Sequence, residues 1–179
     1  NKGLLPEDIN EGKFSGLEKL IFKVYKIYQS KIRDLNACDF GDLILYCVKL
    51  FENHSDIKKI YNNNFKYILV DEFQYTNFIQ NKWINLLVNE QQNICCVGDE
   101  DQSIYSWREA EIKNFLTFDS IYKNCKIFKL EQNYRSTKNI LETASTLISH
   151  NNGRVEKKLW SSAQQGEKVK LNCYQNGRE

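Results

Sequence analysis

Two stretches of this 179-residue sequence decide its fold: Tyr67-Ile68-Leu69-Val70-Asp71-Glu72 and Ile94-Cys95-Cys96-Val97-Gly98-Asp99. Each is a short apolar run without polar alternation that ends in acidic residues. Such a run is typical of a strand that is buried on both faces of a parallel sheet. Residues 76–91 between the two runs have the apolar spacing of a helix. Strand, helix and strand in this order predict an α/β layer with a helix crossing over a parallel sheet.

Helices are expected before the first run. Apolar residues repeat at helical spacing over residues 14–32, and Asp39 with Asp42 has the spacing of a capping box that opens a second helix. Ser55 is expected to cap a short third helix that ends before the polar break at residues 62–64.

Further elements are expected after the second run. Residues 126–130 (Lys-Ile-Phe-Lys-Leu) predict a third strand, and Ser136 is expected to cap a helix that reaches about His150. The alternation of residues 169–174 predicts the start of another strand.

The composition is that of a globular chain that can bury a core. Apolar residues make up 41% and charged residues 27%, with one Pro and eight Gly, which excludes collagen-like, linker-like and disordered chains. The apolar runs are far shorter than the roughly twenty residues of a membrane span, and no basic-then-apolar leader opens the sequence. We therefore expect a cytoplasmic protein without a membrane partner.

Cysteine and charge add two expectations. The six cysteines lie in apolar stretches without a C-x-x-C pair, so we expect free, buried thiols and no structural zinc. The net charge of +2 divides into +1 for residues 1–60, −5 for 61–120 and +6 for 121–179. This division suits a metal site beside a polyanion surface, although solvated faces of unrelated helices would give it too.

The acids after the first run are candidate catalytic residues. Asp71 and Glu72 follow a buried strand and therefore lie at the carboxyl edge of the sheet, where α/β proteins bind ligands. One carboxylate there can hold Mg²⁺, and a second can take a proton from an attacking water. Strands also end in acids simply because they reach solvent.

The second run leads into a polar loop with aromatic residues. Gln102 can hydrogen-bond a phosphate or a water without adding charge. Trp107 next to Arg108 offers a stacking face beside a cation, which suits a single nucleic-acid strand. A half-buried Trp followed by a surface Arg is the structural alternative.

Two more candidates follow residues 126–130. The ring of Tyr134 could lie against a base. Arg135 suits a phosphate because it stands near a predicted helix start, and guanidinium binds phosphate oxygens bidentately. An ordinary surface Arg before a capping Ser136 is the alternative.

Together these stretches resemble three helicase motifs. Residues 71–77 (Asp-Glu-Phe-Gln-Tyr-Thr-Asn), 98–108 and 132–137 (Gln-Asn-Tyr-Arg-Ser-Thr) are similar, in order and spacing, to motifs II, III and IV of the UvrD/PcrA/Rep branch of superfamily 1. Residues 38–44 resemble the Asp-Phe-x-Asp-Leu stretch of that family, and residues 152–160 its segment beyond motif IV. The resemblance covers nearly the whole chain.

The resemblance implies an ATP-dependent 3′-to-5′ DNA translocase with two RecA-like P-loop NTPase lobes. Asp71 would coordinate Mg²⁺, and Glu72 would activate the hydrolytic water. Gln102 would sense the γ-phosphate of ATP and couple it to DNA.

The resemblance also assigns roles in binding DNA and nucleotide to later residues. Trp107 would stack on a base of single-stranded DNA, with Arg108 and Tyr105 beside it. Tyr134 would pack on the adenine, and Arg135 would reach the γ-phosphate as an arginine finger.

By the same resemblance, residues 1–35 end an α-helical insertion, residues 36–131 form the carboxyl-terminal part of the first lobe, and residues 132–179 begin the second. The expected partners are single-stranded DNA, or a duplex with a 3′ single-stranded tail, and the remaining portions of the helicase.

Some features depart from the family. Tyr75 stands where the family usually has Asp, and Glu109 where it usually has Gly. No G-x-x-x-x-G-K-[ST] phosphate loop occurs in these residues, and motifs V and VI are missing too. We therefore expect the 179 residues alone to hydrolyse ATP poorly. A non-catalytic module that binds single strands or another motor is the alternative.

Overall fold

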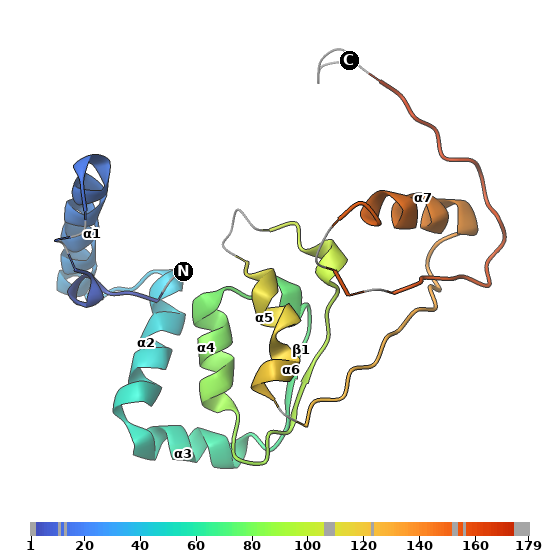
Figure 1. Cartoon of the computed structure of the whole chain (residues 1–179). Helices are drawn as coiled ribbons and strands as arrows, with labels where there is room; N and C mark the ends of the chain where they lie inside the picture. Colours follow the sequence, from blue (N-terminus) through green and yellow to red (C-terminus); the bar gives the residue numbers. More distant parts are fainter. Residues whose placement is uncertain are drawn as a thin grey trace. The chain divides into compact units, whose positions relative to one another are not determined.

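The computed structural model describes residues 3–10, 12, 14–105, 110–122, 124–151, 154–155 and 157–173 (Figure 1). The chain divides into two compact units, Asn1–Lys123 and Asn124–Glu179. The elements of the first unit are η1 (Pro6–Asp8), α1 (Gly16–Asp34), α2 (Phe40–Asn53), α3 (Ser55–Asn64), β1 (Ile68–Val70), η3 (Phe73–Tyr75), α4 (Phe78–Leu87), β2 (Ile94–Cys96), η4 (Glu100–Gln102), α5 (Ile112–Leu116) and α6 (Phe118–Ile121). The second unit contains α7 (Lys138–Ile148).

Capping boxes start α2 and α4. Asp39 Oδ1 accepts from the N–H of Asp42 at 2.8 Å, and Asp42 Oδ2 accepts from the N–H of Asp39 at 3.2 Å. Asn77 and Gln80 make the same exchange at the start of α4, with both distances 3.0 Å. Each pair satisfies amides that the first turn of a helix leaves without partners, which confirms the start predicted from Asp39 and Asp42.

The predicted cap of α3 is wrong by one residue. His54 occupies the N-cap, Ser55 is the first helical residue, and the helix continues through Asn64. α3 follows α2 after His54 alone, so the backbone leaves the helical conformation at His54 and is helical again at Ser55.

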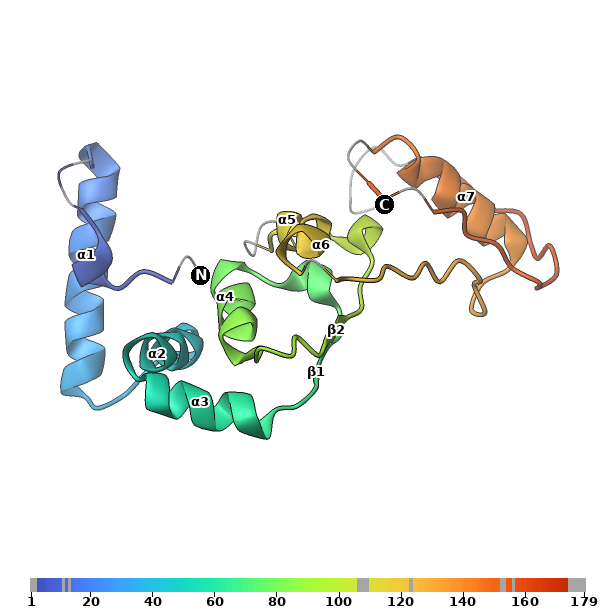
Figure 2. The ribbon, with the colours of Figure 1, turned by 60° about the horizontal axis from the view of Figure 1, so that its bottom comes forward.

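β1 and β2 form a two-stranded parallel sheet, with Ile68 opposite Ile94 and Leu69 opposite Cys95 (Figure 2). α4 connects the two strands, as the sequence predicts. Burial on both faces was expected and is wrong: Leu69 is 79% exposed and Cys95 is exposed, whereas the residues on the other face are half-buried. Nothing in the described part of the chain covers the face that carries Leu69.

The core of the first unit has two parts. Leu45 and Val48 of α2 pack with Leu5 and with Ile79 of α4, and α2 and α4 lie side by side in both ribbon views (Figures 1 and 2). An aromatic cluster lies beneath η3, where the ring of Phe73 contacts Phe115 at 6.4 Å and Phe118 at 5.6 Å between centroids. Phe73 is 1% exposed, so η3 is anchored on this cluster.

The second unit differs from the prediction in its strands. Residues 126–130 form no strand, and the described part of residues 169–174 forms none either. Ile127, Phe128 and Leu130 are 64%, 81% and 85% exposed. A strand needs a hydrogen-bonded neighbour, and in this unit the described pairing is a parallel bridge between Gln132 and Trp160.

Two smaller expectations are also corrected. Thr137, and not Ser136, is the N-cap of α7. All six cysteines are free, as expected, but none is buried: four are exposed and two are half-buried. Among the described residues, no helix is long and apolar enough to cross a membrane.

Candidate active site

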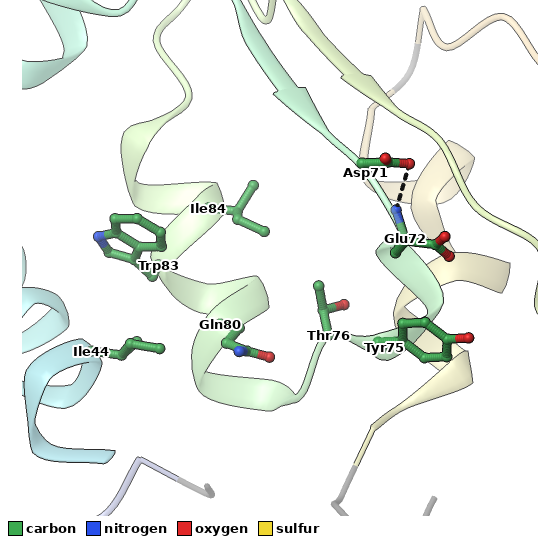
Figure 3. A pocket seen from close by; sticks show the side chains of 8 residues that line it. All are labelled: Ile44, Asp71, Glu72, Tyr75, Thr76, Gln80, Trp83 and Ile84. Carbon is green, nitrogen blue, oxygen red and sulfur yellow. Dashed lines mark hydrogen bonds between the residues drawn. The ribbon is translucent and has the colours of Figure 1, made fainter. Parts of the chain in front are cut away.

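Asp71 and Glu72 occupy the turn between β1 and η3 (Figure 3). Both side chains are exposed. Asp71 Oδ1 accepts a hydrogen bond from the backbone N–H of Glu72 at 2.9 Å. The two carboxylates therefore lie together at the carboxyl edge of the parallel sheet, the edge at which α/β proteins bind ligands.

Asp71 fits a magnesium ligand. Its Oδ1 is held by the Glu72 amide, and its Oδ2 accepts no hydrogen bond from the residues that the structure describes. Mg²⁺ binds through one or two carboxylates and keeps several waters, so one exposed carboxylate oxygen at a sheet edge suits it. The carboxylates of Asp99, Glu100 and Asp101 also lie within 4.8 Å of one another, but an acidic cluster alone does not indicate an ion.

The backbone of Glu72 is left-handed, with φ 51° and ψ 41°. Three backbone hydrogen bonds hold the turn: Phe73 N–H donates to Val97 C=O at 2.9 Å, Tyr75 N–H donates to Glu72 C=O at 2.9 Å, and Val97 N–H donates to Val70 C=O at 2.8 Å. A non-glycine residue keeps this conformation only where its surroundings fix it, so the turn that carries Glu72 is bound to the end of β2.

The residues after β2 form a second polar turn. Gln102 Nε2 donates to Asp99 Oδ2 at 2.7 Å, and Asp101 N–H donates to Asp99 Oδ1 at 3.0 Å. The side chain of Gln102 is exposed but fixed by Asp99. The structure thus brings Asp71, Glu72 and Gln102 to adjacent turns at the ends of two paired strands.

A hollow of about 320 Å³ opens beside this edge. Figure 3 shows Asp71, Glu72, Tyr75 and Thr76 on one side of it and the side chains of α4 and α2 on the other. The lining residues from α4 and α2 are Gln80, Trp83, Ile84 and Ile44. The Trp83 indole nitrogen is buried and has no hydrogen-bond partner among the residues that the structure describes.

Of the three candidate residues for DNA contact, the structure describes Tyr105. Tyr105 packs its ring against Tyr75, with centroids 4.9 Å apart and an angle of 62° between the planes. Trp107 and Arg108 lie outside the described residues, as does Glu109.

The remaining candidates belong to the second unit. Tyr134 is 84% exposed, and its hydroxyl donates to Gln132 Oε1 at 2.8 Å. Arg135 is exposed, and its backbone N–H donates to Asn133 Oδ1 at 3.0 Å. Both lie in the turn before α7 with their side chains directed to solvent, so they are accessible to a ligand.

Comparison with known protein families shows to which family this sequence belongs. A model of the UvrD/REP helicase N-terminal domain matches residues 1–123, and a model of the UvrD-like helicase C-terminal domain matches residues 128–179. This chain belongs to the UvrD/REP helicase family. The resemblance that motifs II, III and IV predict is thereby confirmed, and the family consists of DNA helicases.

Individual UvrD/REP relatives align with 94% to 100% of this chain. A probable DNA helicase II homolog of Rickettsia conorii is 43% identical over 100% of this chain and 28% of its own length. The ATP-dependent DNA helicase PcrA of Leuconostoc citreum is 41% identical over 94% of this chain and 23% of its own length. DNA helicase II of Escherichia coli is 42% identical over 97% and 24%. The chain spans about a quarter of the length of these relatives.

Sequence reasoning assigned no role to Gln74 and Asp99, which connect the two turns. Gln74 is 0% exposed and hydrogen-bonds both turns. One feature of the sequence pointed to Gln74, namely its position two residues after Glu72. A glutamine between Phe73 and Tyr75 in a short turn is either exposed or hydrogen-bonded to specific partners. The identity of these partners could not be predicted, because the pairing of β2 with β1 brings Asp99 to Gln74 and the residues around Gln74 do not specify that pairing.

Proposed function

We propose that this chain is part of an ATP-dependent DNA helicase that couples ATP hydrolysis to 3′-to-5′ movement along single-stranded DNA. The observation that carries the proposal is the position of Asp71 and Glu72 at the carboxyl edge of a parallel sheet, in a turn joined by hydrogen bonds to the turn of Gln102. Membership of a helicase family and the names of the relatives support it.

Three residues of the first unit would carry the chemistry. Bound Mg²⁺ would neutralise charge on the phosphates of ATP. Asp71 would hold that ion through its Oδ2, and Glu72 would accept a proton from the attacking water as a general base. Gln102 would bind the γ-phosphate or the water through a neutral amide, exchanging its hydrogen bond with Asp99 for one with the substrate.

Later residues would bind DNA and complete the nucleotide site. Trp107 would stack on a base, with Arg108 near the backbone and Tyr105 beside them. Tyr134 would lie against the adenine. Arg135 would act as an arginine finger, and such a cation contributes about 10³- to 10⁵-fold to the rate in other phosphoryl-transfer enzymes.

The surroundings of the site support an incomplete RecA-like lobe. Residues 36–131 would form part of the first lobe, residues 132–179 the start of the second, and residues 1–35 the end of a helical insertion. The exposed face at Leu69 and Cys95 and the exposed residues Ile127, Phe128 and Leu130 are apolar surfaces that further helicase segments would cover. We expect the complete helicase to work in the cytoplasm.

The 179 residues alone are proposed to be inactive as an ATPase. The sequence holds no G-x-x-x-x-G-K-[ST] segment, and such a loop supplies the backbone amides that cradle the phosphates. A non-catalytic module that binds single strands or another motor therefore remains the second candidate for these residues in isolation.

Strand displacement tests the proposal. The complete gene product that carries these residues is mixed with ATP, Mg²⁺ and a duplex with either a 3′ or a 5′ single-stranded tail. We expect the 3′-tailed duplex to be unwound, Glu72→Gln to abolish unwinding, and the matched variant Glu90→Gln, at an exposed loop carboxylate, to leave it unchanged. Unwinding of only the 5′-tailed duplex, or unwinding that survives Glu72→Gln, would contradict it.

A further inference from the structure

Gln74 has a buried side chain whose carboxamide nitrogen and carboxamide oxygen both make hydrogen bonds. Its solvent exposure is 0%. Nε2 donates to Glu72 Oε2 at 2.7 Å, and Oε1 accepts from the backbone N–H of Asp99 at 3.0 Å. The amide therefore joins the carboxylate of one turn to the backbone of the other.

The connection continues beyond Asp99. The Oδ2 of Asp99 accepts from Gln102 Nε2 at 2.7 Å. Glu72, Gln74, Asp99 and Gln102 thus form one continuous hydrogen-bonded path. This path joins the proposed general base to the proposed γ-phosphate sensor within a single unit of the chain.

Only a carboxamide fills the middle position. The partner on one side is a carboxylate, which needs a donor, and the partner on the other is a backbone N–H, which needs an acceptor. A glutamate would accept from Asp99 but could not donate to Glu72 when ionised. A methionine would match the length of Gln74 and make neither hydrogen bond.

The backbone leaves room for this contact. A Cβ at residue 98 would collide with Gln74 Oε1 and come within 3.0 Å of the Phe115 ring. Gly98 therefore allows the carboxamide of Gln74 to reach the N–H of Asp99. Phe73 next to it is fixed in the aromatic cluster, so the bridge has little freedom to move.

We propose that Gln74 is a positioning residue that couples Glu72 to Gln102. Gln74 fixes Oε2 of Glu72, which leaves Oε1 of Glu72 for the attacking water. Through Asp99 it also transmits a change at Glu72 to Gln102, and a change at Gln102 to Glu72. This role rests on the proposed function of Glu72 and Gln102. Gln74 itself touches neither substrate nor metal in this account.

A spectroscopic cycle tests the coupling without ATP. The complete gene product is labelled with ¹⁵N in Gln and Asp, and the signals followed are the Asp99 backbone amide and the Gln102 side-chain amide. We expect Glu72→Gln to shift both signals, and we expect the shift to be lost when Gln74→Met is already present. The matched control is Gln91→Met, the same change at an exposed loop glutamine far from the bridge in sequence, so the shift persists.

Equal shifts with and without Gln74→Met would overturn the proposal. If Gln74→Met prevents folding, Gln74→Glu replaces it, because it keeps the acceptor and loses the donor. The Gln74 side-chain amide gives a third measurement: its signal should move in Glu72→Gln and keep its position in Glu90→Gln, at an exposed loop carboxylate. A Gln74 signal that ignores Glu72 contradicts the bridge.

Steady-state kinetics separates this proposal from the proposed function. We expect Gln74→Met to lower kcat for ATP hydrolysis and leave KM unchanged, whereas Gln91→Met at an exposed loop glutamine leaves both unchanged. A protein that shows the spectroscopic coupling but no DNA-stimulated hydrolysis would contradict the helicase function and keep the bridge. Hydrolysis with no change in kcat on Gln74→Met would contradict the bridge and keep the helicase.

Discussion

The ring of Tyr75 packs edge-on against the ring of Tyr105, with centroids 4.9 Å apart. Tyr75 belongs to the turn after β1, and Tyr105 to the loop after η4. The motif resemblance predicts Asp at the position of Tyr75, and an Asp there would supply no ring for this contact. The departure noted in the sequence therefore has a packing partner.

Tyr75→Asp should destabilise the first unit. The substitution removes an aromatic pair that contributes about 0.5–1.5 kcal/mol beyond burial. We expect a lower urea midpoint with an unchanged m value, and no change for Tyr75→Phe, which keeps the ring. A Tyr75→Asp protein as stable as the unsubstituted one would show that the ring contact contributes nothing.

Gly98→Ala should destabilise the same unit by a different route. The added methyl meets Gln74 Oε1, the Phe115 ring at 3.0 Å and the Phe73 amide nitrogen at 3.2 Å. Overpacking of this kind costs about 1–3 kcal/mol. The control is Gly12→Ala, where the new Cβ meets Asn10 Oδ1 at 3.3 Å and no other atom of the described residues within 4 Å. Thermal unfolding should distinguish the two variants, and equal melting temperatures would contradict the close approach.

Asp39 should make the start of α2 sensitive to acid. The N–H of Asp42 and the hydroxyl of Tyr28 donate to its carboxylate and lower the pKa of Asp39. Because the folded pKa lies below the unfolded value of about 3.9, the stabilisation is present in full above roughly pH 5 and disappears as the pH falls through the folded pKa.

Asp39→Ala measures this dependence. Loss of an N-cap costs about 0.5–2 kcal/mol, so we expect that loss in urea unfolding at pH 7 and a smaller loss near pH 3. Asp39→Asn keeps an acceptor for the Asp42 amide and should lose less at pH 7. A cost of Asp39→Ala that is the same at both pH values would contradict the role of the ionised carboxylate.

Trp107→Ala should weaken binding of single-stranded DNA. Removal of a stacking ring costs about 1–3 kcal/mol per base, and fluorescence anisotropy with a labelled oligonucleotide would detect it in the complete gene product. Trp107→Phe keeps an aromatic face and should bind nearly as well. Unchanged affinity in Trp107→Ala would remove Trp107 from the proposed DNA contacts.

The sequence predicts the features of this structure that involve neighbouring residues. It does not predict the features that require pairing between segments far apart in the sequence. The capping box of Asp39 and Asp42 involves residues three apart, and the sequence identifies it. β1 and β2 are found within one residue at each end because their apolar runs are bounded by polar ones. The strand predicted for residues 126–130 fails because an apolar run shows that a segment can pair, but not that a neighbour is present.

In the candidate active site, too, local features could be predicted from the sequence and contacts between distant segments could not. The positions of Asp71, Glu72 and Gln102 at strand ends follow from the pattern and from the motifs. The hydrogen bonds of Gln74 do not, because they require the register that places Val70 opposite Cys96 and brings Gly98 beside the first turn. The relation of Tyr134 and Arg135 to these residues stays a prediction of the motif resemblance.

Phosphate release stimulated by single-stranded DNA tests the central claim most directly. In the complete gene product with Mg²⁺ and ATP, we predict hydrolysis that rises when single-stranded DNA is added. We predict that Glu72→Gln lowers kcat by about 10²- to 10⁴-fold, the usual contribution of a general base. Hydrolysis that DNA does not change, or that Glu72→Gln leaves intact, would contradict the account.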